Sequence, residues 1–381
     1  MVETELTETG LVLARRGQDA LGSSFEQPCY RIPALAVTAS GRLLAAWDVR
    51  ADWRDLPGPF DLVVRHSDDN GRTWTPPRHL RAHKPGRGFG DASLLVAADG
   101  RVLCFHAGSS GESFFSATAD GPGLELWLAA SDDDGLTWTF RDLTDDLRPS
   151  GIAGMFASSG NGVRLEGGEH AGRLLQPFVL RRPIGDAAGP ALHALDAAEH
   201  WSALARSDDG GLSWRLGAWI GPDCDENKVV ETPSGGLLLH ARARPRRRWA
   251  SSTDGGETFS APVAHPQLVD PACNGGLCRW DGVLVCSLLD DDAERRRLVL
   301  RTSVDEGATW SEASVVDAGA AGYSVLAPLA DGTLGLLYEA GDYDELIFRR
   351  ITRGELGLDG RRPTLVARQG SGAAKPPQIA V

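Results

Sequence analysis

The 381-residue sequence has no uninterrupted apolar stretch near the ~20 residues that a membrane-spanning helix requires. Its first ten residues, MVETELTETG, carry three glutamates and no apolar segment, so they do not resemble a secretory signal. The six cysteines show no spacing typical of a disulfide framework or of a zinc site. We therefore expect free thiols and a cytoplasmic location, or a secreted protein if a leader has been removed.

Positive charge is also scarce. The sequence has 39 lysines and arginines against 52 aspartates and glutamates, a net charge of -13, which disfavours nucleic acid as a partner. The negative electrostatic potential that follows from this net charge repels an anionic ligand unless a local group of cations surrounds the ligand. There is no Gly-x-Ser-x-Gly elbow and no phosphate-binding Gly-Lys-Ser/Thr loop. No metal or cofactor is therefore predicted.

The sequence does contain one eight-residue pattern in five copies, Ser-x-Asp-x-Gly-x-Ser/Thr followed by Trp or Phe. The starts of successive copies are 64, 76, 45 and 51 residues apart, the size of a β-propeller blade with variable loops. The copies are SDDNGRTW (67–74), SDDDGLTW (131–138), SDDGGLSW (207–214), STDGGETF (252–259) and SVDEGATW (303–310).

Each copy, called an Asp box below, has the chemistry of a hairpin turn. The Asp carboxylate accepts backbone N–H groups, Gly supplies a positive φ, and the aromatic ring closes over the turn. A calcium loop needs Asp or Asn at the first, third and fifth places before its Gly. The first place fails in every copy, where the residues are His66, Ala130, Arg206, Ser251 and Thr302. The boxes are therefore predicted to be structural.

Short apolar runs such as RLLAAWDVR and LGLLYEAG lie between Asp-Gly, Ser-Gly and Gly-Gly turns, which indicates an all-β protein. We predict a single six-bladed β-propeller over residues 1–369, with Asp-box turns, and a disordered C-terminal tail over residues 370–381. The N-terminal strand near Leu11–Arg16 is expected to complete the last blade, because a propeller needs its two ends fastened together.

Four ionisable residues interrupt apolar, strand-like segments. Arg31 lies in CYRIPALAV, and Arg242 lies in GLLLHARAR. Glu226 comes sixteen residues before Arg242, and Glu339 comes sixteen residues after Tyr323. A charge inside a strand costs several kcal/mol unless it is paired. These residues therefore either form buried ion pairs or line a site where the central channel of the propeller opens.

Tyr-Arg-Ile-Pro at residues 30–33, together with the Asp boxes and the downstream Arg, Glu and Tyr segments, resembles the sialidase (neuraminidase) family of glycoside hydrolases. The resemblance extends over residues 28–350 and is to the bacterial exo-α-sialidase type. It implies hydrolysis of terminal α-linked sialic acid from glycoconjugates, with retention, through a sialyl-tyrosine intermediate and without a cofactor. The implied partner is a sialoside, with no nucleic acid and no membrane.

In that family three arginines bind the substrate carboxylate, because a planar guanidinium binds a carboxylate through two parallel hydrogen bonds. By motif the first two are Arg31 and Arg242. The third falls in AERRRLVLRTSVDEG, where spacing favours Arg295, and Arg296 or Arg297 stays possible.

The resemblance also assigns the reacting groups. Tyr323 matches the nucleophile, and Glu226 matches the base that takes its proton. Asp55 matches the general acid and base at the leaving oxygen, with Asp52 as a nearby competitor. Glu339 resembles the carboxylate that orients the first arginine.

Arg50 and Asp91 resemble the pair that contacts the 4-hydroxyl of the sugar, although Asp91 is followed by Ala92 where the family often has Pro. The region 108–125 is individual to this chain, and its FFSATADGPG segment is expected to shape the pocket for the acyl group. Candidate aromatic residues for that pocket are Phe115, Trp127 and Phe156.

Alternatives to the hydrolase stay open. A trans-sialidase, or a hydrolase of a related nonulosonic acid, would use the same active site. A non-catalytic sugar-binding propeller would keep the boxes but lose the nucleophile or the acid. Tyr323, Glu226 and Asp55 are all present, which argues against this last alternative.

Overall fold

The computed structural model describes residues 4–5, 10–18, 25–183 and 198–359, and nearly all of their regular structure is β-strand. The described residues also contain the four-residue helix α1 (Thr144–Leu147) and the 3-10 helix η2 (Gly354–Leu356). No helix in this part of the chain is long and apolar enough to cross a membrane. The predicted boundary between residues 369 and 370 lies outside the described residues.

Four of the sheets have four or five strands each. The first contains β3 (Cys29–Val37), β4 (Leu43–Arg50), β5 (Asp61–Ser67) and β6 (Arg78–Arg81). The second contains β12 (Gly160–Asn161), β7 (Gly88–Val96), β8 (Val102–Ser109), β9 (Glu125–Ser131) and β10 (Thr139–Asp142). The third contains β11 (Gly154–Ala157), β13 (Val163–Arg164), β14 (Leu174–Pro183), β15 (Ala198–Ser207) and β16 (Arg215–Ile220). The fourth contains β17 (Asn227–Glu231), β18 (Leu237–Ala241), β19 (Arg246–Ser252) and β20 (Val263–Val269).

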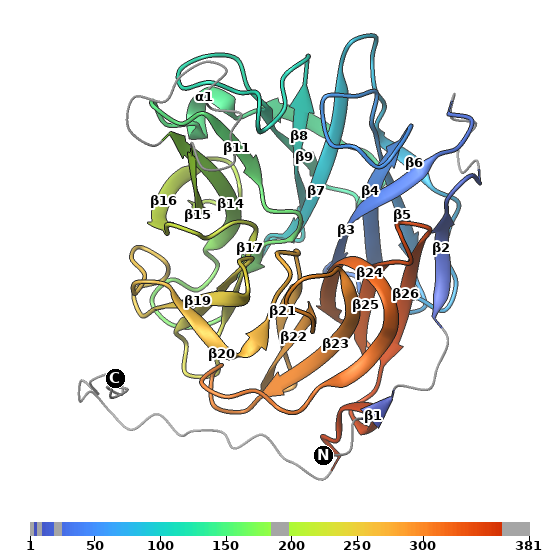
Figure 1. Cartoon of the computed structure of the whole chain (residues 1–381), viewed down its shortest axis with the longest axis vertical. Helices are drawn as coiled ribbons and strands as arrows, with labels where there is room; N and C mark the ends of the chain where they lie inside the picture. Colours follow the sequence, from blue (N-terminus) through green and yellow to red (C-terminus); the bar gives the residue numbers. More distant parts are fainter. Residues whose placement is uncertain (1–3, 6–9, 19–24, 184–197, 360–381) are drawn as a thin grey trace.

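The remaining sheet has eight strands. They are β21 (Gly276–Trp280), β22 (Val283–Leu289), β23 (Arg296–Ser303), β24 (Ser314–Pro328), β25 (Leu334–Ala340), β26 (Glu345–Ile351), β2 (Leu11–Arg15) and β1 (Thr4–Glu5). The sheets stand around a central axis, with β3, β7, β17 and β21 nearest the centre (Figure 1). The predicted all-β propeller arrangement is confirmed.

The prediction of six separate blades is wrong, because the described residues form four sheets of blade size and one continuous eight-stranded sheet. The reason is the length of β24, which has fifteen residues. Its first half, Ser314–Ala320, pairs with β23, and its second half, Ala321–Pro328, pairs with β25. Five boxes mark turns, but they do not show where one strand continues from one sheet into the next.

The ring is closed by the first long strand. β2 pairs antiparallel with β26, with Leu11 opposite Phe348 and Val12 opposite Ile347. The N-terminal strand expected near Leu11–Arg16 is therefore confirmed as Leu11–Arg15. Pairing the start of the chain with its last strand fastens the two ends of the ring, so that no gap is left between them.

Apolar side chains of small or medium size fill the space between neighbouring sheets. Ala34, Leu44 and Leu62 of the first sheet pack in one cluster with Leu94 and Cys104 of the second, and all five are 0% exposed. Strand β3 is buried along eight of its nine residues, so it has no solvent-facing side. An ionisable residue in such a strand must therefore find its partners inside the ring.

All five Asp boxes form the same hydrogen-bonded turn. In the first, the Ser67 hydroxyl donates to Asp69 at 2.7 Å and accepts from the Gly71 amide at 2.8 Å. Asp69 also accepts from the Thr73 amide at 2.8 Å and the Thr73 hydroxyl at 2.6 Å. The other four repeat this pattern. The prediction that the boxes are turns is confirmed.

The boxes also fasten neighbouring sheets together. Trp74 of the first box packs edge-on against Phe348 of β26, and Trp214 of the third packs against Phe105 of β8. Gly71 has a φ of +83°, and a Cβ there would lie 2.1 Å from the Phe348 ring. Glycine is therefore needed both for the turn and for the close approach of the next sheet.

Substituting Asp69→Ala should lower the free energy of unfolding by about 1–2 kcal/mol, because three hydrogen bonds within the turn are lost. Asp68→Ala is the matched control: Asp68 is exposed in the same turn, and its pair with Arg42 should contribute well under about 1 kcal/mol. Urea unfolding measures both. Equal effects of the two substitutions would contradict the role assigned to the box.

Candidate active site

A cavity opens on the side of the ring where the inner strand of a sheet begins and the strand that follows it ends. Seven of the nine residues singled out from the sequence line it: Arg31, Asp55, Asp91, Glu226, Arg242, Arg295 and Tyr323. The other two, Arg50 and Glu339, contact lining residues from behind. Residues from position 31 to position 323 are thus brought together at one place by the ring.

Irregular pairing near the start of β3 and β7 and in the middle of β24 aims side chains into this cavity. The register shifts between Arg31 and Ala34 in β3, between Gly90 and Ser93 in β7, and between Ala321 and Ser324 in β24. Arg31 lies at the edge of the first shift, and Asp91 and Tyr323 lie within the other two. A β-bulge leaves residues unpaired and turns a side chain away from its regular direction, and bulges are over-represented next to active sites.

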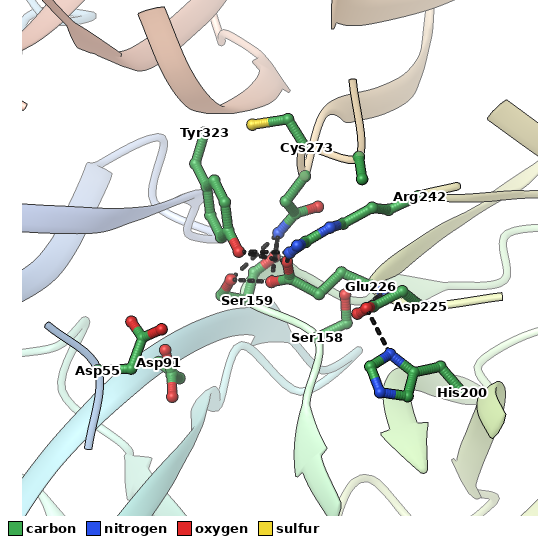
Figure 2. Close-up of polar contacts among 12 residues, drawn as sticks. Asp55, Asp91, Ser158, Ser159, His200, Asp225, Glu226, Arg242, Cys273 and Tyr323 are labelled. Carbon is green, nitrogen blue, oxygen red and sulfur yellow. Dashed lines mark hydrogen bonds and ion pairs between the residues drawn. The ribbon is translucent and has the colours of Figure 1, made fainter. Parts of the chain in front are cut away.

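Tyr323, Glu226 and Arg242 form one hydrogen-bonded group at the floor of the cavity (Figure 2). The Tyr323 hydroxyl donates to Glu226 Oε2. Arg242 Nη1 donates to the same oxygen at 2.7 Å and to the Tyr323 hydroxyl at 2.9 Å. Burial, and then the Glu226 charge, raise the pKa of Tyr323 well above its ordinary value, so the phenol is protonated in this arrangement.

Arg31 is held by Glu339, a residue with no exposed surface. Arg31 Nε donates to Glu339 Oε1 at 3.2 Å, and the Ile32 amide donates to the same oxygen at 2.9 Å. The other oxygen accepts the Tyr323 amide at 2.8 Å. Burial disfavours the charged guanidinium, but Glu339, together with smaller contributions from Tyr323, Tyr343 and Asp55, outweighs it and keeps the pKa of Arg31 above its ordinary value.

Of the three consecutive arginines, Arg295 lines the cavity. Its guanidinium carbon lies 5.5 Å from the centre of the Tyr323 ring, and its Nη1 donates to the Tyr343 hydroxyl at 3.1 Å. Arg296 and Arg297 pair instead with Asp291 and Asp290, at 3.1 and 3.5 Å.

Asp55 lies against two arginines at the rim of the cavity. Its Oδ1 is 2.9 Å from Arg50 Nη1 and 3.5 Å from Arg31 Nη1, while 67% of its side chain is exposed. Burial alone would raise the pKa of Asp55, but Arg50 and Arg31 outweigh it and lower the pKa. The competitor Asp52 pairs with the exposed Arg54 and does not line the cavity.

Arg50 is 1% exposed and is surrounded by carboxylates. Its Nη2 lies 2.7 Å from Asp48 and 3.8 Å from Asp91, and its guanidinium carbon lies 4.4 Å from the Phe60 ring centre. Burial raises the pKa of Asp48 to about 6, and burial together with the Asp48 charge raises the pKa of Asp91 well above its ordinary value. Asp48 and Asp91 therefore compete for the charge of a single arginine.

Two of the three aromatic residues expected at the acyl-group pocket line the cavity, Phe115 and Phe156, together with Phe114. Trp127 does not line it. Its ring packs at 3.8 Å from the Arg81 guanidinium carbon, and its Nε1 donates to Glu125 at 2.7 Å. The expectation for Trp127 is wrong because its strand, β9, carries it to the Arg81 side of the sheet.

Several residues of the site were missed by the sequence reasoning. Tyr343 stacks 4.2 Å from the Arg31 guanidinium carbon and so links two of the cavity arginines. Asp225 lines the cavity and pairs with His200 at 2.8 Å. Asp48 had a signal, since it is a charge inside the apolar run LLAAWDVR. Tyr343 had none, because it lies in an ordinary polar turn, AGDYDE.

Among the described residues, no group of three or more His, Cys, Asp or Glu side chains is placed to hold a metal ion. What the arrangement offers is a buried phenol with a carboxylate beside it, three arginines that face one cavity, and a carboxylate at the rim. Such a cavity suits an anionic ligand in a chain whose net charge is -13.

Repeats and ring together define the chain as a BNR-type propeller, and the BNR repeat-like domain family matches residues 170–336. The sialidase of Micromonospora viridifaciens is 37% identical over 338 residues, which cover 82% of this chain and 50% of that protein. Hadza microbial sialidase Hz136 has a similar solved structure, with a TM-score of 0.73 and 26% identity over 85% of this chain and 66% of that one. Over most of its length the chain is therefore similar to BNR-repeat sialidases.

An intramolecular trans-sialidase from Ruminococcus gnavus has the same fold, with a TM-score of 0.74 and 20% identity over 91% of this chain and 98% of that one. The present chain spans half the length of the Micromonospora sialidase.

Glu339→Gln should lower the free energy of unfolding by about 3–5 kcal/mol, because it leaves the buried Arg31 charge with only the exposed Asp55 as an ionic partner. Glu345→Gln is the control, since Glu345 pairs with the half-exposed Arg15 at 2.6 Å and should contribute below about 1 kcal/mol. Urea unfolding followed by tryptophan fluorescence measures both. A small effect at Glu339 would show that the buried pair is not needed for stability.

Proposed function

We propose that the protein is an exo-α-sialidase, which hydrolyses terminal α-linked sialic acid from glycoconjugates with retention through a sialyl-tyrosine intermediate. The observation that carries the proposal is the buried phenol of Tyr323, which is hydrogen-bonded to Glu226 and faces the same cavity as Arg31, Arg242 and Arg295. The relationship to sialidases supports it.

The three arginines would bind the substrate carboxylate. Sialic acid carries this group on its anomeric carbon, so a fixed cluster of cations places the reacting carbon beside the phenol. A carboxylate nucleophile at that position would be repelled by the substrate, whereas a neutral phenol is not. Glu226 takes the phenol proton as the Tyr323 oxygen attacks, so charge on the nucleophile develops in the transition state.

Asp55 would serve as general acid and base at the leaving oxygen. Without substrate it is a counterion of Arg50 and Arg31, and these two cations hold it ionised. A substrate carboxylate that binds Arg31 competes for this cation and adds a negative charge nearby. Both effects favour protonation of Asp55, so the bound substrate itself converts the rim carboxylate into an acid.

Arg50 and Asp91 would contact the 4-hydroxyl of the sugar, and the aromatic wall of Phe114, Phe115 and Phe156 would receive the acyl group. Asp91 and the three aromatic residues line the cavity, and Arg50 lies behind Asp91 at 3.8 Å. The assignment to the 4-hydroxyl follows the resemblance to sialidases. Sialoside recognition without a cofactor, and the cytoplasmic location, stay predictions.

We also propose that the eight-stranded sheet serves as two blades joined through β24, since the two halves of β24 pair with different strands.

Transfer is the second candidate reaction, because the Ruminococcus gnavus structure with the same fold is an intramolecular trans-sialidase. The two reactions share the tyrosine intermediate and differ in the group that attacks it. Nuclear magnetic resonance of the product decides between them: α-configured free sialic acid at early times supports retaining hydrolysis, and an anhydro sugar supports intramolecular transfer.

Tyr323→Phe should lower kcat by about 100- to 10,000-fold, with a melting temperature close to that of the unmodified protein. Asp55→Asn should lower kcat/KM strongly for a sialyl-galactoside and much less for 4-nitrophenyl sialoside, whose leaving group needs no proton. Steady-state kinetics on the two substrates tests both roles. An equal loss for both substrates would overturn the acid role of Asp55.

Arg295→Ala should weaken binding of free sialic acid by about 10- to 100-fold, because hydrogen bonds between charged groups are lost. Arg296→Ala is the matched control, since this neighbouring guanidinium pairs with Asp291 outside the cavity. Isothermal titration calorimetry measures both affinities. A larger loss for Arg296→Ala would move the third cation to that position.

A further inference from the structure

A buried polar network lies beneath the carboxylate of Glu226. It joins Ser159 beside β12, Glu226 and Lys228 at the start of β17, and Asn274 before β21 (Figure 2 labels Ser159 and Glu226). All four residues are at most 4% exposed. Buried polar groups nearly always have hydrogen-bond partners. The donor and acceptor of each bond in this network can therefore be assigned.

Lys228 determines which way the Asn274 amide faces. Lys228 Nζ lies 2.8 Å from Asn274 Oδ1 and 2.7 Å from the Ser159 carbonyl oxygen, and an ammonium group only donates. Asn274 Nδ2 therefore faces the other side, where Glu226 Oε1, the Ser159 hydroxyl and the Ser159 carbonyl oxygen each lie 3.1 Å away. A flipped amide would set its oxygen against a carboxylate and a carbonyl.

The two oxygens of Glu226 consequently have separate partners. Oε1 accepts from Asn274 Nδ2 and from the Ser159 hydroxyl, both at 3.1 Å. Oε2 accepts from Tyr323 and from Arg242. Because the phenol already donates to Oε2, and both donors of Oε1 come from the opposite side, a proton that leaves Tyr323 is received at Oε2.

We propose that Asn274, held by Lys228, is a positioning residue that directs proton exchange between Tyr323 and Glu226, a role that rests on the proposed sialidase activity. In the first step the phenol proton moves to Oε2 while the Tyr323 oxygen bonds to the sugar, and the leaving oxygen departs with the proton of Asp55. In the second step Asp55 removes a proton from water, whose oxygen bonds to the sugar, and Tyr323 recovers its proton from Oε2.

Asn274 can donate to Glu226 in both its ionised and its protonated form, since Oε1 remains an acceptor when Oε2 carries a proton. Burial lowers the pKa of Lys228 to about 7, with Glu226 opposing this effect and Arg247 adding to it. A neutral amine still has two hydrogens for its two close acceptors. The other ionisable groups next to Glu226 are Tyr323 on β24, Arg242 after β18, Asp91 on β7 and Asp225, whose Oδ1 accepts the Glu226 amide at 2.7 Å.

Asn274→Asp tests the proposal. The substitution keeps the shape but replaces the N–H that faces Glu226 with a carboxylate oxygen, which opposes the ionised form of Glu226. The acidic limb of the kcat/KM profile should move up by about 1 pH unit, and kcat should fall by about 10- to 100-fold. Asn161→Asp is the control, since the Asn161 amide donates to the Leu326 carbonyl at 2.9 Å, and its profile should match that of the unmodified protein.

Two further measurements separate positioning from a general loss of structure. Asn274→Asp should bind free sialic acid with nearly unchanged affinity, and it should cause no further loss when combined with Glu226→Gln. An unshifted pH profile, or an equal loss in the Glu226→Gln background, would overturn the role of Asn274. An unmodified protein that releases no sialic acid from any sialoside would instead overturn the proposed function.

Discussion

Glu339 is the interaction on which both the ring and the cavity depend. Its carboxylate binds the guanidinium of Arg31, the amide of Ile32 and the amide of Tyr323, so it joins β25 to the beginning of β3 and to the middle of β24. The side chain has no exposed surface, and every one of these donors would be left unsatisfied without it. Gly322 permits this approach, because a Cβ there would lie 2.1 Å from Glu339 Oε2.

A second constraint is the balance of charge in a strongly acidic chain. Each cavity arginine has an acidic or phenolic partner, and the partners differ in how firmly they are held. Glu339 and Glu226 are buried and fixed by several donors, whereas Asp55 is bound by cations alone and is largely exposed. An incoming anion can therefore compete with Asp55 but not with Glu339. The site is built with one replaceable counterion, at the rim where a leaving group would lie.

The sequence predicted the parts of the molecule whose signals are local. The Asp boxes are local turns, and Arg31 and Glu339 stand out as charges within apolar strands. The number of sheets was predicted wrongly, because the continuation of β24 through two pairings leaves no mark in composition. Trp127 was placed wrongly, because an aromatic residue in a strand does not reveal which face it covers.

The network beneath Glu226 could not be predicted for a related reason. Ser159 and Asn274 are neutral polar residues in segments far apart along the chain, and each alone is typical of a loop. Lys228 was a charge in a strand like the others, but its partners are an amide and a backbone carbonyl rather than a carboxylate. Searching for opposite charges therefore does not find it.

The irregular starts of the inner strands explain how one ring both packs tightly and presents polar groups. Ile32 and Asp91 have φ angles of +63° and +61°, which non-glycine residues adopt at a cost in energy. That cost is met by the regular pairing that resumes within two or three residues on the same strand. On the C-terminal side of each bulge the strand packs as part of the core. At the bulge itself the side chain points into the cavity. The positions of Arg31, Asp91 and Tyr323 are thus set by rigid strands rather than by loops. Of the other reacting groups proposed here, Asp55 lies on the segment between β4 and β5, and Glu226 lies directly before the first residue of β17.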